Sequence, residues 1–404
     1  MVELQAPLQY TGHPDWSVAP RAVEILERHA AHKDLVDALG VLAVALLNQG
    51  RTREGILAAD RALELAHDLG LPRPGRALGW RGSARVQLGD RGGLVDLQEA
   101  LALAKAAGQS RQAAIMYNEY GSCLYQFEGP LGVLSVAREG ISFAHARGLP
   151  AVERLLVLGL ADLLVDVGDL DEGADLATSL LGEVEATEST MIGAALATPA
   201  RAYLHRGQLD AAAALADRIE ALDYAEAFDG TGSTSLALAA HIRAQAGDVE
   251  RVGPLLRRAR EASEHEMAPG NFLRDAVPAA VLIGDLDLAQ ALLDAPRDQL
   301  PWVTNVHVMG TALVAEAAGE IGEATRGFDT AAAAWRSMGA QFDEAPAALH
   351  HGRCLVRLGR IAEALAPLTR AEQLFAIMGA EPGLAEARGL LATARPPVDG
   401  DPAS

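Results

Sequence analysis

Nine glycines recur along the chain at intervals of 35 to 40 residues, and this spacing constrains the fold more than any other feature. Each glycine lies between two apolar-periodic segments, as in LVDVGDLDEG and LVRLGRIAEA. Glycine readily takes the left-handed conformation that ends a helix, so each one is expected to mark a turn between two helices. Self-similarity at this period is typical of helical repeat proteins. The turn glycines are Gly50, Gly89, Gly129, Gly168, Gly207, Gly247, Gly284, Gly319 and Gly359.

A second set of glycines lies about midway between turn glycines and is expected to end several of the second helices. Each unit is therefore predicted to be a helix, a tight turn and another helix. One such pair cannot bury its apolar face alone, so successive pairs stack. The predicted fold class is all-α: a right-handed α-solenoid of about nine helix-turn-helix repeats of 35–40 residues, with a C-terminal capping helix. The second set comprises Gly70, Gly108, Gly148, Gly339 and Gly379.

The repeat register divides the chain into four predicted segments. Residues 1–33 form an irregular leader and a single helix, which together make a partial repeat. Residues 34–379 form the nine-repeat solenoid, and residues 380–395 form the capping helix. Residues 396–404 are expected to be a disordered tail. An incomplete first unit exposes apolar surface, so we expect self-association through the N-terminal end.

Composition limits the partners and the compartment. The formal net charge is −20, which opposes the counterion release that drives nucleic-acid binding and also opposes anionic membranes. No stretch has the length and apolar character of a spanning helix, and no signal-peptide pattern begins the sequence. Two cysteines far apart in the chain fit a reducing compartment. We expect a cytoplasmic protein with no nucleic-acid partner and no membrane contact.

Small residues recur seven positions before the turn glycine, as Gly352 does before Gly359, and often five positions after it, as Ala364 does. This pairing resembles the tetratricopeptide repeat, in which small residues let the two helices approach closely. The units here exceed the usual length of about 34 residues, and HEAT or armadillo repeats of about 40–47 residues are the alternative. The small-residue pairing and the lack of a recurrent proline in the first helix favour the tetratricopeptide type.

Three longer segments carry a narrower resemblance: Leu88–Gly108, Tyr117–Pro130 and Leu368–Leu391. They are similar to the C-terminal helical repeat regions of large actinobacterial regulators, of the cyclase/ATPase type or the LuxR/MalT-like type. The resemblance implies a bacterial regulatory protein. It transfers no catalytic residue, because the catalytic and nucleotide-binding modules of those regulators have no counterpart in this sequence.

Motifs that carry catalysis or phosphate binding were not found in the sequence. It has no G-x-x-x-x-G-K-[ST], no H-E-x-x-H and no G-x-S-x-G. We therefore expect a protein that is not an enzyme and that uses no cofactor and no metal. A concentration of aromatic residues in the third unit is interpreted as packing between repeats, the alternative being a ligand-stacking surface. These aromatic residues are Tyr117, Tyr120, Tyr125 and Phe127.

Polar residues concentrate at two positions of the first helix in each unit, six and two residues before the turn glycine. In the tetratricopeptide pattern these positions line the concave groove. A buried unpaired charge costs several kcal/mol, so we expect these side chains to face water or a partner. Acidic residues fall in the fourth unit, and basic residues follow in the fifth and sixth. The candidate groove residues are Ser83, Gln87, Glu119, Asp162, Asp166, Arg201, His205, His241, Gln245, Arg353 and Arg357.

The predicted function is a non-catalytic interaction scaffold, or a sensory repeat domain, that binds a protein or peptide in its concave groove. The alternative is a small-molecule or peptide sensor whose groove ligand changes the superhelix. On either prediction, replacing Arg201 and His205 by alanine is expected to abolish binding with little loss of stability.

Overall fold

The computed structural model describes residues 17–29, 32–186, 191–222, 232–263, 270–294 and 300–394. Over these ranges the chain forms helices and no strands. The helices are α2 (Val18–Arg28), α3 (His32–Leu47), α4 (Thr52–Asp68), α5 (Gly75–Gln87), α6 (Gly93–Ala106), α7 (Ser110–His145), α8 (Pro150–Asp166), α9 (Leu170–Ala186), α10 (Ile192–His205), α11 (Leu209–Glu220), α12 (Gly232–Gln245), α13 (Val249–Ser263), α14 (Leu273–Leu282), α15 (Leu286–Leu293), α16 (Pro301–Ala317), α17 (Ile321–Met338), α18 (Gln341–Arg357), α19 (Ile361–Met378) and α20 (Glu381–Ala394).

The helices pair into the nine predicted units, from α3 with α4 to α18 with α19. The third unit is the long helix α7, which Gly129 divides with φ 70° and ψ −175°. All nine turn glycines and all five glycines of the second set have positive φ, which confirms both sets as helix ends. Helix α20 follows the ninth unit and buries Leu384, Ala387 and Leu391 against it. The all-α solenoid with a capping helix is therefore confirmed.

Small residues bring the two helices of a unit close together. In the fourth unit, a Cβ atom on Gly173 would lie 2.7 Å from the carbonyl oxygen of Ala161. In the second unit, a Cβ atom on Gly82 would lie 2.7 Å from the carbonyl oxygen of Gly93. Neither distance is compatible with a side chain, so glycine at these positions sets the spacing between the helices.

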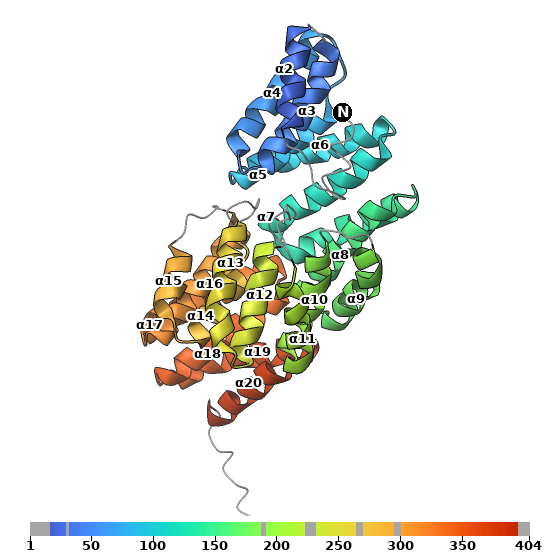
Figure 1. Ribbon diagram of the computed structural model, residues 1–404. Helices are drawn as coiled ribbons and strands as arrows, with labels where there is room; N and C mark the ends of the chain where they lie inside the picture. The colour runs from blue at the N-terminus through green and yellow to red at the C-terminus, as the bar shows by residue number, and fades with distance from the viewer. Residues whose placement is uncertain are drawn as a thin grey trace, which may run out of the picture.

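The solenoid does not stay open. Helices α16 and α17 return to contact α7, α18 contacts α8, and α20 contacts α10, so units far apart in the sequence lie side by side (Figure 1). The contacts join turns at the ends of the helices. A Cβ atom on Gly339 would lie 2.5 Å from Cβ of Leu131, and one on Gly168 would lie 3.6 Å from Cβ of Gln341. We call the part from α7 to α20 the closed turn.

The first units, α2 to α6, project from the closed turn as an arm (Figure 1). Their core is a separate cluster of buried residues that reaches α7 and the start of α16. Ile25 on α2 is 47% exposed. Residues 1–16 of the predicted leader and the whole predicted tail, 396–404, lie outside the described residues.

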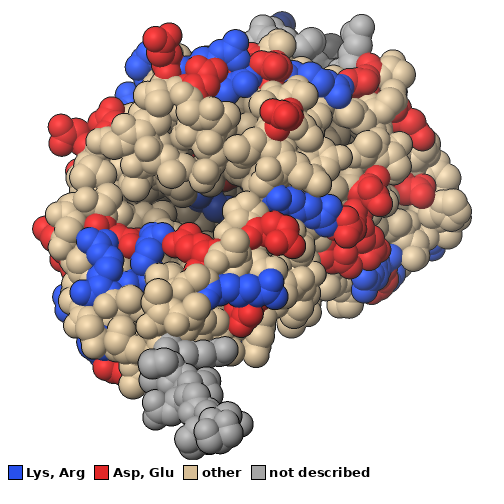
Figure 2. All heavy atoms as spheres, turned by 90° about the horizontal axis from the view of Figure 1, so that it is seen from below, with Lys and Arg blue, Asp and Glu red and all other residues tan. Residues whose placement is uncertain are grey.

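Acidic and basic side chains are interspersed around a hollow in the face that Figure 2 shows. Among the described residues, no helix combines the length and the apolar character needed to cross a membrane.

Candidate functional site

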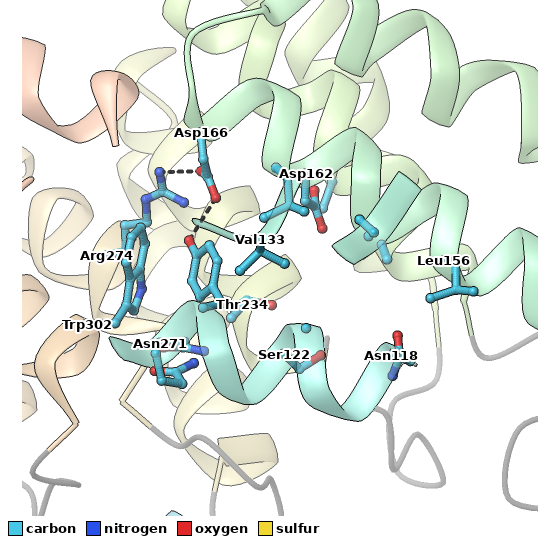
Figure 3. Close-up of a pocket in the computed structure, with 18 of the residues that line it drawn as sticks. Asn118, Ser122, Val133, Leu156, Asp162, Asp166, Thr234, Asn271, Arg274 and Trp302 are labelled. Atoms are coloured by element: carbon cyan, nitrogen blue, oxygen red, sulfur yellow. Dashed lines mark hydrogen bonds and ion pairs between the residues drawn. The ribbon is translucent and has the colours of Figure 1, made fainter. Parts of the chain in front are cut away.

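A cavity of about 360 Å³ lies inside the closed turn (Figure 3). We call it the central cavity. Side chains from the first helices of six successive units line most of it, because these helices form the inner layer of the solenoid, and Val133 of the second half of α7 joins them. The polar residues that line it are Asn118, Ser122, Gln126, Asp162, Asp166, Arg201, Thr234, Ser235, Asn271 and Arg274, and the larger apolar and aromatic ones are Tyr117, Tyr125, Val133, Leu156, Leu163 and Trp302.

Arg274 of α14 joins two acidic residues across the closed turn. Its Nε and Nη2 atoms donate to the Asp343 carboxylate at 2.8 and 2.5 Å, and Nη2 also donates to Asp166 Oδ1 at 2.8 Å (Figure 3). The guanidinium lies 4.9 Å from the ring centroid of Phe342. Burial opposes ionisation of Arg274, but the two carboxylates outweigh burial and raise its pKa. Burial, together with the charge of Asp166, raises the pKa of Asp343 to about 6.

A second ion-pair network lies beside the first. Arg201 Nη2 of α10 donates to Asp275 Oδ2 at 3.0 Å, and His241 Nδ1 of α12 lies 3.0 Å from Asp275 Oδ1. Burial opposes ionisation of Asp275, but Arg201 and His241 outweigh burial and lower its pKa. Asp275 therefore stays ionised and ties α14 to α10 and α12.

His205 lies against the aromatic ring of Phe342, with 3.8 Å between the ring centroids. Burial lowers the pKa of His205 to about 3, and the neighbouring cations act in the same direction. The imidazole is therefore neutral at physiological pH and packs as a ring rather than as a charge.

The central cavity has a mouth and a floor. Ser122 of α7 and Gly159 of α8 line it and are exposed, so solvent reaches the cavity between these two helices. Gln126 and Ser235 also line it but are only 9% and 0% exposed. They therefore mark its inner end.

Four buried polar atoms on residues that line the central cavity have no hydrogen-bond partner in the described protein. They are Gln126 Oε1, Arg201 Nε, Ser235 Oγ and Asn271 Oδ1. Leaving a buried donor or acceptor unsatisfied costs about 1–3 kcal/mol, so native proteins rarely gather several in one place. These four atoms have almost no accessible surface, so their residues line the cavity while the atoms themselves are packed behind its wall.

Aromatic side chains close one side of the cavity. Tyr125 packs on Trp302 with 4.3 Å between ring centroids, and its hydroxyl donates to Asp166 Oδ2 at 2.7 Å. Trp302 packs in turn on Trp335 at 4.7 Å. Tyr125 thus serves both predicted uses of the aromatic cluster, because it packs between repeats and also lines the cavity.

The structure brings together five of the candidate groove residues, Asp162, Asp166, Arg201, His205 and His241. The prediction that these side chains face water is wrong for those that form ion pairs, Asp166, Arg201 and His241. The reason is closure of the solenoid: α14 and α18 supply Arg274, Asp275, Phe342 and Asp343, which neutralise or cover them. Replacing Arg201 by alanine would leave Asp275 without its arginine, so the expectation that stability is retained does not fit this geometry.

The remaining candidates lie elsewhere. Ser83 donates to buried Glu119 at 3.2 Å, Gln87 accepts from Thr52 at 3.0 Å, and Gln245 is exposed. These three sites are outside the central cavity.

Arg353 and Arg357 belong to a separate charged cluster near the capping helix. Arg353 forms two hydrogen bonds with Glu316, at 2.8 and 2.9 Å, and pairs with Glu386 of α20 at 2.7 Å. Arg357 lies 3.7 Å from Glu316. Burial opposes ionisation of Glu316, but its basic neighbours lower its pKa to about 2. This cluster fastens α20 and does not line the central cavity.

Sequence reasoning missed Arg274, Asp275, Trp302 and Asp343. One signal was available for Arg274, which lies ten residues before Gly284 and so continues the groove positions by one more helical turn. Asp343 has no such signal, because only closure brings the start of α18 to α8.

The two cysteines and the possible metal ligands of the described residues were compared with what thiol or metal chemistry needs. Cys123 and Cys354 are free and buried, and burial raises the pKa of both thiols, so neither is a reactive thiolate. Among the described residues, no three His, Cys, Asp or Glu side chains gather as metal ligands would. The cavity is equipped for hydrogen bonds, ion pairs and aromatic contacts.

Comparisons with known proteins extend to the fold alone. No family model and no curated protein matches the chain. The solved structure of the human IFIT1 dimer with PPP-AAAA is 15% identical, covers 93% of this chain and 86% of its own, and has a TM-score of 0.44. The same dimer with m7Gppp-AAAA is 15% identical, covers 92% and 88%, and has a TM-score of 0.43. Yeast Tom70 is 12% identical, covers 95% and 97%, and has a TM-score of 0.33.

These matches correct one expectation. The prediction of no nucleic-acid partner rested on net charge, yet IFIT1, a similar helical repeat structure, is solved with the oligonucleotides PPP-AAAA and m7Gppp-AAAA. That prediction is contradicted, and the likeness assigns no ligand to this chain. The described residues of the chain themselves form a helical repeat fold of paired helices.

Proposed function

We propose that this protein is a small-molecule binding protein whose ligand occupies the central cavity. The observation that carries the proposal is a cavity of about 360 Å³ that is lined by charged, polar and aromatic side chains, Asp162, Arg201 and Tyr125 among them.

Size favours a small molecule over a peptide. The volume of about 360 Å³ lies in the range of small-molecule pockets and cannot contain a helix with its side chains. The predicted peptide groove is crossed by Arg274, which binds Asp166 on one side and Asp343 on the other. A peptide along the groove would have to break these buried ion pairs, which is costly.

A ligand here would also act on the shape of the protein. The cavity wall combines helices α7 and α8 with α14 and α16, and these helices belong to opposite sides of the closure. A ligand that contacts both sides stabilises the closed turn by about RT ln(1 + [L]/Kd). We therefore propose a small-molecule sensor, in which the bound ligand changes the shape of the superhelix.

The biological setting belongs to the same proposal. A bacterial, cytoplasmic regulator without enzymatic activity agrees with the resemblance of the repeats to regulator sequences. The free, buried cysteines also fit a reducing compartment.

Blocking the mouth should abolish ligand binding and spare the fold. A Cβ atom on exposed Gly159 meets no atom within 4 Å, so the position accepts a side chain, and Gly159→Trp is expected to place an indole over the mouth. A thermal-shift and calorimetric screen of small metabolites should give ligands for the wild type whose affinity falls at least tenfold in Gly159→Trp.

The matched control is Gly182→Trp on the outer helix α9, where glycine is also exposed and also meets no atom within 4 Å. It should bind as the wild type does. Equal binding by all three proteins would place the ligand outside the central cavity and contradict the proposal.

A further inference from the structure

We propose that the ligand of the central cavity is a small organic cation whose protonated nitrogen pairs with the carboxylate of Asp162. This inference rests on the proposed function and names the class of ligand.

Asp162 is the carboxylate of the cavity wall that has no basic side chain of the described residues at ion-pair distance. Asp162 and Asp166 line the cavity and Asp275 and Asp343 lie beside it, and the basic residues among them are Arg201, Arg274 and His241. Arg274 is held by Asp166 and Asp343, and Arg201 is held by Asp275. No lysine, arginine or histidine of the described chain lies within ion-pair distance of Asp162, which accepts a hydrogen bond from Thr198 instead.

Removal from water disfavours the ionised form of the Asp162 carboxyl group. Burial raises the pKa of Asp162 above its ordinary value, and the charges of Arg201 and Arg274 reduce the shift only in part. A cation in the cavity would restore the lost solvation by direct pairing, whereas an anion would add a second negative charge beside Asp162.

The neighbouring groups suit a cation with an apolar body. Asn118 and Ser122 of α7 line the cavity and are not buried, and their side-chain oxygens can accept from N–H groups. Tyr125 and Trp302 offer aromatic surface, and Leu156 adds aliphatic wall.

Matched probes that differ only in charge test the inference. One set is tryptamine, indole-3-ethanol and indole-3-acetate. The other is cyclohexylmethylamine, cyclohexylmethanol and cyclohexanecarboxylate. By calorimetry, the amine of at least one set should bind at least tenfold more tightly than its alcohol and its acid. Gly159→Trp should remove that binding.

The decisive variant is Asp162→Asn, which keeps the shape and the hydrogen bond from Thr198. Amine affinity should fall at least tenfold, and alcohol affinity should stay within twofold. Because the variant removes a half-buried charge that has no ion-pair partner, its melting temperature should equal or exceed that of the wild type, whereas a structural role would lower it. Asp210→Asn on the exposed face of α11 is the control and should change neither quantity.

Failure of the inference is distinguishable from failure of the proposed function. If neutral or anionic compounds bind and Gly159→Trp blocks them, the cavity is a ligand site but the cation assignment is overturned. The assignment is also overturned if no amine binds, or if amines bind equally well to Asp162→Asn. If amine binding is unaffected by Gly159→Trp, both proposals fail.

Discussion

Replacing Arg274 by methionine is expected to lower the free energy of unfolding by about 3–5 kcal/mol. Methionine keeps the aliphatic volume but leaves Asp166 and Asp343 buried, close together and without their shared cation. The loss should also open the closed turn, because Arg274 connects α14 to both α8 and α18. Urea unfolding followed by circular dichroism measures the change.

Two further variants make that result specific to the ion pairs. Arg257→Met on the exposed face of α13 should change stability by less than about 0.5 kcal/mol. Adding Asp343→Asn to Arg274→Met removes one of the stranded charges and should recover part of the loss. A loss below about 1 kcal/mol in Arg274→Met would show that the network does not hold the closed turn.

Gly339→Ala is expected to destabilise the protein by about 1–3 kcal/mol more than the same change at Gly379. The two glycines end helices α17 and α19 in the same left-handed conformation, with φ 69° and 62°. The strain of alanine in that conformation, about 1–2 kcal/mol, is therefore common to both. Only Gly339 faces the closure, where the new Cβ would lie 2.5 Å from Cβ of Leu131, whereas Gly379 meets no atom within 4 Å.

Thermal unfolding and small-angle scattering should separate the two variants. Gly339→Ala should melt at a lower temperature and show a larger radius of gyration, while Gly379→Ala keeps the wild-type dimensions. Adding Leu131→Gly to Gly339→Ala removes the clashing Cβ and should restore the dimensions. Identical behaviour of the two alanine variants would mean that the contact with Leu131 contributes nothing to closure.

Local features of the chain were predictable because they are encoded within one unit. Turn glycines such as Gly168 and Gly207 need only a positive φ, and that need is visible as a spacing. Gly173 opposite Ala161 follows from the same register, as does the capping helix after Gly379. These features depend on neighbours in sequence, and the period reveals them.

Closure was not predictable, because it joins residues about 70 to 200 positions apart through turns that carry no shared motif. Asp343 reaches Arg274 only when α18 returns to α8. Polar groove residues such as Asp166 were therefore correctly grouped but wrongly placed in water. A charged side chain needs either water or a partner, and in the folded protein these side chains have ion-pair partners instead of water.

A designed disulfide tests most directly whether the repeat chain closes on itself and encloses the cavity. Cβ atoms at positions 168 and 341 would lie 3.6 Å apart, which suits a disulfide, and both native cysteines are buried. Gly168→Cys with Gln341→Cys should therefore cross-link within one chain under mild oxidation. Gly247→Cys with Gln341→Cys should stay reduced, because a Cβ on Gly247 meets no atom within 4 Å. If the first pair also stays reduced in folded protein, the turn is open and the account of the central cavity is contradicted.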